Sequence, residues 1–396
     1  MRFLWRVLVV LASITTAACR ATDPAAARRG GSPPQPARNA ETLFDAVDSV
    51  VVRAVRDSAF PAAQLSIGTK DSILHSRCFG RYTYEQDSRT VTPSTLFDLA
   101  SLTKVVATTS AVMKLVEDGR LKLDDPVGNF IPAFTRGEKQ AVTLRHLLTH
   151  RSGLPPFRRF YDFCPDAIAA LDSVYATPLV ARPGDTTIYS DLGMIVLGKV
   201  VQHAAGMPLD AYFDREFLRP LRMGSTMFNP PAALRSSAAP TELDTTWRHG
   251  LVWGAVHDEN AAFLGGVSGH AGLFSNAEDL SKFVQMLLGG GASRGIRLLR
   301  PETVELFLSP VAGADRLLGW DRKSPRGSSA GELFSARSFG HTGFTGTSIW
   351  VDPERDLFVI FLTNRVYPTR ANMRISAVRR ELHDAVASAV DRSVGK

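Results

Sequence analysis

The sequence predicts an α+β fold in which both ends of the chain build one antiparallel sheet and the middle forms a mostly helical lobe. Two strand-like runs, 63–67 and 72–79, lie near the start, and two more, 347–351 and 357–363, lie near the end. Between them, roughly over 101–308, apolar residues recur mainly at helical spacing. The cleft between two such lobes is where ligands tend to bind.

The sheet is expected to be flanked by helices from both ends of the chain. Apolar residues recur at helical spacing from 41 to 57 and again from about 373 to 389. The helical segments expected in the middle of the chain are 101–118, 144–149, 194–205, 209–217 and 277–288.

Composition and charge limit the classes of function. The 396 residues are 44% hydrophobic and 21% charged, as in an ordinary globular protein, which excludes disorder for most of the chain. Of the net charge of +7, residues 1–40 carry +5, so residues 41–396 carry only +2. That remainder has no basic stripe with interleaved aromatic residues, and we therefore expect no nucleic-acid partner.

Residues 1–18 have the layout of an export signal peptide. A basic start is followed by an apolar stretch from Val7 to about Ile14, too short to span a bilayer, and by small residues before Cys19. The run TAAC resembles the bacterial lipoprotein signal, in which the cysteine is acylated, although Thr16 stands where that signal prefers Leu. An ordinary cleaved signal with a chance cysteine is the alternative.

Lipidation of Cys19 would make residues 19–40, rich in Ala, Pro, Gly and Arg, a flexible tether to the folded domain 41–396. We then expect an exported lipoprotein, anchored to a membrane and facing the periplasm or the cell exterior. The periplasm is oxidising, so Cys78 and Cys164 could pair, and the sequence leaves open whether they do.

The first motif with catalytic potential is Ser101-Leu102-Thr103-Lys104, an S-x-x-K pattern. Ser101 opens a predicted helix, so its backbone N–H lies at a helix N-terminus, where negative charge is stabilised. Lys104 projects from the same face one turn later and can reach the Ser101 hydroxyl as a base or proton relay. The tetrad alone also fits an N-cap serine followed by a solvent-facing lysine.

Two further motifs decide between these interpretations. Tyr189-Ser190-Asp191 lies within PGDTTIYSDLG, where a loop would expose the tyrosine, and His341-Thr342-Gly343 begins the late hairpin. The order S-x-x-K, a Y-x-N-like motif and H-T-G resembles the serine β-lactamase and penicillin-binding protein superfamily. Segments such as 142–155 and 271–283 resemble its esterase-like and low-molecular-weight penicillin-binding branch, and the resemblance spans about residues 42–390.

This resemblance implies a β-lactamase/transpeptidase-like fold and assigns roles to the motif residues. Ser101 is the expected nucleophile, Lys104 its partner, and Tyr189 the base in acylation and for the deacylating water. A tyrosine of ordinary pKa, about 10, needs the Lys104 ammonium nearby to act as a base at neutral pH. The backbone N–H groups of Ser101 and Phe344 are expected to form the oxyanion hole.

The third motif is expected to lie beside the bound substrate, with His341 and Thr342 lining it. Gly343 suits such a strand because a side chain there would obstruct a close-lying acyl group. His341 stands where many members have lysine; with an ordinary pKa of about 6.5 it would lose its charge between roughly pH 6 and 7.5. Asp191 replaces the usual Asn, which removes an amide donor unless Asp191 pairs with Lys104. Both departures favour ester-like substrates.

Three further residues, His257, Asp258 and His270, are expected either to line the site or to make local hydrogen bonds within loops. The Gly-rich segment 264–274 lacks a following Gly-Lys-Ser/Thr, so a loop bordering the cleft is preferred to a phosphate cradle.

One pair of histidines has a spacing that metal sites use. His146 and His150 stand four apart, as metal-binding pairs do, but Leu147 occupies the position of a zincin's catalytic Glu. We therefore expect no metal and no cofactor.

The sequence thus predicts a serine hydrolase that forms an acyl-enzyme on Ser101. Its substrate would be a small-molecule ester, a cell-wall D-amino-acid peptide or a β-lactam, with the ester and the peptide preferred. The alternatives are a β-lactamase, or a lipid-tethered penicillin-binding sensor or cell-wall binding module with little turnover. The intact Ser101, Lys104 and Tyr189 argue against a protein without activity.

Overall fold

The computed structural model describes residues 43–393 and 395 of the chain. The predicted signal peptide 1–18, the lipidation site Cys19 and the tether 19–40 lie outside the described residues.

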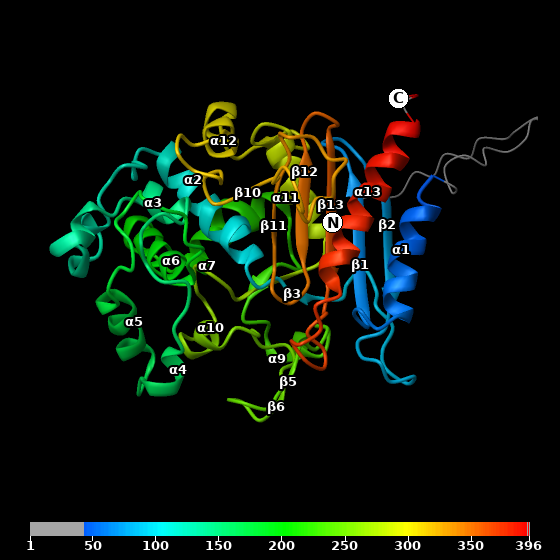
Figure 1. Cartoon of the computed structure of the whole chain (residues 1–396), viewed down its shortest axis with the longest axis horizontal. Coiled ribbons are helices and arrows are strands. Elements are labelled where there is room, and N and C mark those ends of the chain that lie inside the picture. The colour runs from blue at the N-terminus through cyan, green and yellow to red at the C-terminus, as the bar shows by residue number, and fades with distance from the viewer. Residues whose placement is uncertain (1–42, 394, 396) are drawn as a thin grey trace, which may run out of the picture. The chain divides into compact units, whose positions relative to one another are not determined.

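The domain is built on a six-stranded antiparallel sheet with strand order β10-β11-β12-β13-β1-β2 (Figure 1). Two strands come from the start of the chain and four from its end: β1 (Ala62–Gly68), β2 (Ile73–Gly80), β10 (Asp321–Arg322), β11 (Phe339–Thr342), β12 (Ser348–Asp352) and β13 (Leu357–Thr363). The two ends meet where β1 pairs with β13, with Leu65 opposite Phe361. The predicted α+β class and the sheet built from both chain ends are confirmed.

Helices cover both faces of this sheet. On one face α1 (Asp45–Arg56) packs beside α13 (Ile375–Ser393), and on the other lie α11 (Ala277–Leu288) and the helical lobe (Figure 1). Strand β13 supplies both cores because its side chains alternate. Leu357, Val359 and Phe361 belong to the first core, whereas Phe358, Ile360 and Leu362 belong to the second.

The middle of the chain forms the helical lobe. Its helices are α2 (Ser110–Glu117), α3 (Leu144–Leu148), α4 (Phe160–Phe163), α5 (Ala167–Ala176), α6 (Asp191–Ala205), α7 (Leu209–Phe213), α8 (Arg219–Leu221), α9 (Ala232–Arg235), α10 (Glu259–Phe263) and α12 (Pro301–Leu308). The short strands form three small sheets. In the first, β7 (Leu273–Ser275) lies between β3 (Phe97–Asp98) and β4 (Met227–Phe228). The other two are hairpins: β5 (Leu243–Asp244) with β6 (Gly250–Leu251), and β8 (Ala292–Ser293) with β9 (Ile296–Arg297).

Among the described residues, no single helix is long and apolar enough to cross a membrane. Helix α6 and the segment Leu209–Leu221 together reach that length and apolarity, but only as a pair bent by 68°. Most apolar side chains of α6 are buried in the core of the domain.

The helix after Ser101 is less regular than its sequence predicts. A π-helical segment, Lys104–Thr109, precedes α2 in place of one continuous α-helix. The hydroxyls of Thr109 and Ser110 donate to the carbonyls of Lys104 (2.8 Å) and Val105 (3.3 Å), five residues back, which stabilises the wider turn. Such π-helical turns are frequent at functional sites, because they redirect the side chains of the helix.

One other expectation is corrected, and one open question is answered. The helix predicted over 144–149 ends at Leu148, and His150 beyond it has the left-handed φ of 54°, so the spacing of His146 and His150 is not that of a helix face. Cys78 on β2 and Cys164 after α4 are free thiols, which answers the question that the sequence left open.

Candidate active site

Ser101 lies just after β3, on a strained turn. Ala100 has φ of 46°, a region that non-glycine residues seldom adopt, and its N–H donates to the Asp98 carboxylate at 2.8 Å. The backbone N–H of Ser101 donates to no group in the described part of the chain. The turn therefore offers both the hydroxyl and a free N–H of Ser101 to the cleft that they line.

Lys104 lies one turn beyond and is 1% exposed. Its Nζ donates to the Ser101 hydroxyl at 2.8 Å and to the His270 carbonyl at 2.9 Å, and it forms an ion pair with Asp191 at 2.8 Å. Burial alone would lower the pKa of Lys104, but the Asp191 carboxylate and the Tyr189 phenol raise it above its ordinary value. An ammonium whose pKa is raised stays protonated at neutral pH, so Lys104 acts as a donor and not as a general base.

Tyr189 stands beside this lysine, and four side chains surround its ring. The Lys104 Nζ lies 5.1 Å and the Arg316 guanidinium carbon 5.4 Å from the ring centroid, and the ring centroids of His150 and His341 lie at 4.6 and 5.9 Å. Tyr189 keeps 37% of its surface accessible on the cleft side, so one edge can meet a substrate.

The ionisation of Tyr189 differs from the expectation. Burial raises its pKa above the ordinary value, although the Lys104 ammonium and the Ser101 hydroxyl lower it in part. The Asp191 carboxylate adds to the rise. Tyr189 is therefore a phenol in the resting protein at neutral pH, and its reactive phenolate is a minor species that grows with pH.

The start of α6 fixes the second motif. The Ser190 hydroxyl caps this helix by accepting from the Gly193 N–H at 3.1 Å, and the Ser190 N–H donates to His150 Nδ1 at 3.0 Å. Burial holds the pKa of His150 well below its ordinary range, so this ring is neutral. His150 therefore positions the Ser190 backbone. His146, the other histidine considered as a metal ligand, accepts the Thr143 N–H through Nδ1 at the start of α3.

Arg316 is the site residue that the sequence analysis missed. Its guanidinium forms an ion pair with Asp321, while its Nε and Nη2 are buried and have no partner in the described part of the chain. Arginine in a loop without a motif carries no signal in a single sequence, so only the fold reveals that it lies over the Tyr189 ring.

His341 lies behind Tyr189 and does not line the cleft. It sits on β11 opposite Ile349, is 2% exposed, and its Nδ1 lies 2.8 Å from the Thr342 carbonyl. Burial lowers the pKa of His341 to about 4; the Asp321 carboxylate opposes this change, and the charge of Arg316 reinforces it. The predicted loss of charge between pH 6 and 7.5 is therefore wrong, because His341 is neutral throughout that range. Thr342 is half-buried and also stands outside the lining.

Gly343 is required by packing of the backbone and not by the space that an acyl group needs. A Cβ there would lie 2.1 Å from the Thr347 hydroxyl and 2.5 Å from the Leu99 carbonyl. The hydroxyls of Thr345 and Thr347 donate to the carbonyls of Asp98 (2.7 Å) and Leu99 (3.0 Å). The loop after β11 is thus bonded directly to the segment that precedes Ser101.

This bonding brings the two expected oxyanion donors to one cleft. Phe344 is 48% exposed and lines the same cleft as Ser101, and its N–H has no partner in the described part of the chain. Two free backbone N–H groups beside a serine hydroxyl can stabilise the negative oxygen that forms when that hydroxyl attacks a carbonyl.

The cleft has a volume of about 330 Å³. The Ser101, Tyr189 and Asp191 side chains line it together. The remaining lining residues are Ala100, Pro156, Phe157, His257, Asp258, Glu259, Ala271, Phe344 and Arg370.

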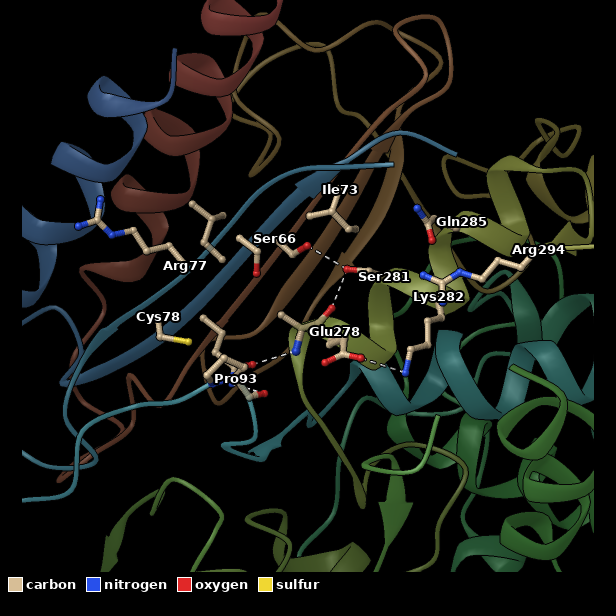
Figure 2. Close-up of a pocket in the computed structure, with 14 residues that line it drawn as sticks. Ser66, Ile73, Arg77, Cys78, Pro93, Glu278, Ser281, Lys282, Gln285 and Arg294 are labelled. Carbon is tan, nitrogen blue, oxygen red and sulfur yellow. Dashed lines mark hydrogen bonds and ion pairs between the residues drawn. The ribbon is translucent and has the colours of Figure 1, made fainter. Parts of the chain in front are cut away.

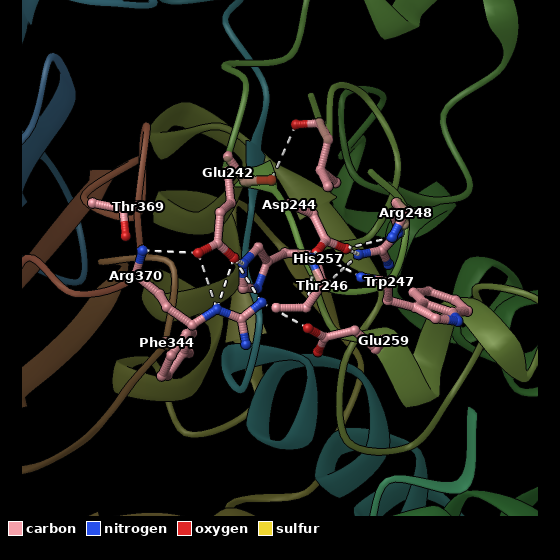
Figure 3. Close-up of polar contacts among 12 residues, drawn as sticks. Glu242, Asp244, Thr246, Trp247, Arg248, His257, Glu259, Phe344, Thr369 and Arg370 are labelled. Atoms are coloured by element: carbon pink, nitrogen blue, oxygen red, sulfur yellow. Dashed lines mark hydrogen bonds and ion pairs between the residues drawn. The ribbon is translucent and has the colours of Figure 1, made fainter. Parts of the chain in front are cut away.

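A network of charged side chains forms one wall of the cleft (Figure 3). Arg370 binds the Glu242 carboxylate through Nε (2.8 Å) and the Glu259 carboxylate through Nη2 (2.6 Å), and His257 Nε2 lies 2.8 Å from Glu242. The pKa of Glu242 falls to about 2, because hydrogen bonds from His257 and Arg370 outweigh the opposing effect of burial. Each charge in this wall is paired, so the wall is rigid and offers no free cation to a substrate.

The three residues expected near the site divide in their placement. His257 and Asp258 line the cleft, whereas His270 is buried behind it. His270 Nε2 lies 2.8 Å from the Asp258 carboxylate, and the His270 carbonyl accepts from Lys104. The pKa of Asp258 lies below its ordinary value, because His270 and the Ala261 N–H outweigh the effect of burial. No group of three His, Cys, Asp or Glu side chains within the described residues could hold a metal ion.

A second hollow of about 140 Å³ lies between β1, β2 and α11 (Figure 2). It shares no lining residue with the Ser101 cleft. The hydroxyls of Ser66 and Ser281 bond to each other there at 2.9 Å, and burial raises the pKa of the Cys78 thiol. The hollow thus holds neither an activated hydroxyl nor a thiolate, and the Ser101 cleft is the candidate active site.

Comparison with known proteins agrees with this geometry. A family model described as β-lactamase matches residues 47–383. A protein of Escherichia coli (strain K12) named "putative D-alanyl-D-alanine carboxypeptidase" is 34% identical over 345 residues, which cover 78% of this chain and 79% of that protein. A protein of the same name from Salmonella schwarzengrund (strain CVM19633) is 32% identical over 357 residues, 81% of this chain and 82% of that protein.

Solved structures show the same fold. EstCE1, described as a hydrolase with promiscuous acyltransferase activity, superposes with a TM-score of 0.70 at 23% identity and covers 88% of this chain and 99% of its own. The octameric penicillin-binding protein homologue from Pyrococcus abyssi superposes with a TM-score of 0.68 at 24% identity, over 88% of this chain and 77% of its own. Motifs, fold and sequence similarity agree, and the chain belongs to the β-lactamase family, within the serine β-lactamase and penicillin-binding protein superfamily of serine hydrolases.

Proposed function

We propose that this protein hydrolyses small neutral carboxylic esters through an acyl-enzyme on Ser101. The observation that carries the proposal is the ion pair at 2.8 Å between Asp191, which lines the cleft, and the buried Lys104. Asp191 stands where related motifs have an amide, and its carboxylate is used by Lys104, so it offers no donor to a substrate amide. The neighbouring lining is apolar at Pro156, Phe157 and Phe344, which suits an acyl chain.

The proposed reaction begins with attack of the Ser101 hydroxyl oxygen on the ester carbonyl. The Lys104 ammonium orients this oxygen, and the phenolate form of Tyr189 takes its proton. The N–H groups of Ser101 and Phe344 stabilise the oxyanion. Collapse of the intermediate expels the alcohol, which receives the proton from Tyr189. Water then attacks the acyl-enzyme carbonyl and gives a proton to Tyr189. The bond to the Ser101 oxygen breaks, this oxygen takes that proton back from Tyr189, and the carboxylic acid leaves.

The pH dependence tests the role of Tyr189. Because the pKa of Tyr189 is raised, its phenolate fraction at pH 7 is below about one in a thousand and grows about tenfold per pH unit. We expect kcat/KM for p-nitrophenyl butyrate to rise from pH 7 to beyond pH 9, after subtraction of spontaneous hydrolysis. Tyr189→Phe should lower kcat/KM by about 100-fold or more and remove this rise. A wild-type profile that is level by pH 8 would contradict the assignment.

A second candidate, a D-alanyl-D-alanine carboxypeptidase, is favoured by the names of the relatives and by Arg316. The Nε and Nη2 of Arg316, which have no partner among residues 43–393 and 395, are donors that a substrate carboxylate could use after a small rotation of the Tyr189 ring. The two candidates share the acyl-enzyme on Ser101. They differ only in whether Arg316 binds a carboxylate at the end of the substrate.

Turnover of three probes distinguishes the candidates: p-nitrophenyl butyrate, a peptide ending in D-Ala-D-Ala, and nitrocefin. We expect the ester to have the highest kcat/KM. Arg316→Gln should leave ester turnover within about threefold, since a neutral ester makes no ion pair with it. Release of D-alanine at a higher kcat/KM than the ester, with loss of about tenfold or more in Arg316→Gln, would establish the carboxypeptidase instead.

A further inference from the structure

The peptide unit between Gly343 and Phe344 is held from behind by a buried arginine. Arg379 of α13 donates through Nη2 to the Gly343 carbonyl at 3.2 Å and to the Thr347 carbonyl at 2.7 Å. Within the described residues the only cis peptide bond is Tyr367-Pro368, so the Gly343–Phe344 peptide is trans. Because a trans peptide is planar, its C=O and N–H point in opposite directions, and the Phe344 N–H points away from Arg379.

A second buried arginine holds the next peptide unit. Arg365, which follows β13, donates through Nε to the Phe344 carbonyl at 2.8 Å. Its Nη1 donates to the carbonyls of Arg370 and Asn372, both at 2.8 Å. The guanidinium carbon of Arg365 also lies 4.5 Å from the centroid of the Phe344 ring. Both peptide units that flank the Phe344 Cα are therefore fixed by guanidinium groups.

This arrangement is costly for the fold. Arg379 is 7% and Arg365 is 3% exposed, and no carboxylate of the described residues lies within ion-pair distance of either. Burial lowers the pKa of Arg379 to about 9, and the charge of Arg365 contributes to the same change. Buried cations with no carboxylate at ion-pair distance destabilise a protein relative to apolar residues of the same size, so stability alone does not account for them.

The contacts of the two arginines with the Phe344 backbone, beside Ser101, suggest a role in catalysis. A cation bonded to a carbonyl oxygen polarises the amide, and the N–H of the same peptide becomes a stronger donor. We propose that Arg379 and Arg365 are positioning residues of the oxyanion hole, which fix and polarise the Gly343–Phe344 peptide so that the Phe344 N–H meets the negative oxygen of the tetrahedral intermediate. This inference rests on the proposed acyl-enzyme function.

A purely structural role would be to attach α13 to the sheet, and the chain offers a matched control for it. Arg355, at the turn between β12 and β13, joins Asp352 to Asp391 of α13 at 2.9 Å on each side. Arg355→Met removes an attachment of the same helix without contact to the loop after β11. We expect it to lower the melting temperature and to leave kcat unchanged.

The experiment compares Arg379→Met, Arg379→Lys and Arg355→Met with the wild type. The measurements are melting temperature, kcat and KM for p-nitrophenyl butyrate, and the inhibition constant of phenylboronic acid, whose tetrahedral adduct on Ser101 places an oxygen in the oxyanion hole. Arg379→Met should lower kcat by about 10- to 100-fold with KM within about twofold, and weaken the boronic acid by the same factor. Arg379→Lys should retain part of the kcat and part of the boronic acid affinity, since it keeps a cation near the Gly343 carbonyl.

The outcomes separate the inference from the proposed function. If Arg379→Met binds the boronic acid as the wild type does, or loses no more activity than Arg355→Met, the positioning role is overturned. If Arg379→Met does not fold, Arg379→Lys and Arg365→Lys decide by the same comparison of kcat with boronic acid affinity. A wild-type protein that neither reacts with a fluorophosphonate nor binds the boronic acid would overturn the acyl-enzyme proposal, and the inference with it.

Discussion

Replacing Ser101 by alanine is expected to abolish labelling by a fluorophosphonate and to lower ester hydrolysis by about a thousandfold or more. Among the residues that line the cleft, the hydroxyls are those of Ser101 and Tyr189, and Lys104 donates to the former at 2.8 Å. The substitution removes only the hydrogen bonds of one hydroxyl, to Lys104 and to Tyr189, so the melting temperature should stay within a few degrees of the wild type. A labelling gel and a p-nitrophenyl butyrate assay measure the effect.

The chain supplies its own control for this experiment. Ser393 and Lys396 repeat the S-x-x-K spacing at the end of the sequence. The Ser393 hydroxyl donates to the Val390 carbonyl within α13 at 2.7 Å, an ordinary contact within a helix. Ser393→Ala should therefore label and turn over as the wild type does. Retained labelling in Ser101→Ala would assign the nucleophile to another residue and end the proposed mechanism.

Replacing Lys104 by methionine should have the next largest effect, on both activity and stability. The Asp191 carboxylate, 19% exposed, would lose its counter-charge, which costs up to about 3 kcal/mol of unfolding free energy. Ester turnover should fall by about 100-fold or more, because the Ser101 hydroxyl loses its donor and Tyr189 loses the nearby charge that favours its phenolate. Thermal melting and kcat/KM give the two quantities.

Substitution of Asp191 separates these two effects. Asp191→Asn keeps the Lys104 charge and removes a carboxylate that raises the pKa of Tyr189, so the rise of kcat/KM with pH should begin at lower pH. The double substitution Lys104→Met with Asp191→Asn should regain most of the lost stability, since no unpaired charge is left, but none of the activity. Recovery of activity in the double variant would show that Lys104 serves only to neutralise Asp191.

The sequence alone predicts the architecture and identifies the three motifs. The apolar runs 63–67 and 357–363 predict strands, and the structure pairs them as β1 and β13. Such predictions succeed because period-2 and period-3.6 patterns report directly which faces of a strand or helix are buried. The order of the motifs S-x-x-K, Y-x-D and H-T-G is likewise visible in the sequence without any knowledge of the tertiary structure.

Only the tertiary structure decided the chemical state of the site. The sequence predicts that His341 titrates near neutrality, but burial lowers its pKa to about 4 and keeps it neutral. The sequence also predicts that Lys104 lowers the pKa of Tyr189, but burial outweighs this effect and raises it. Arg316 and Arg379 reach the site from segments that carry no motif. The physical reason is that desolvation and Coulomb interactions depend on distances between residues far apart in the chain, and those distances exist only after folding.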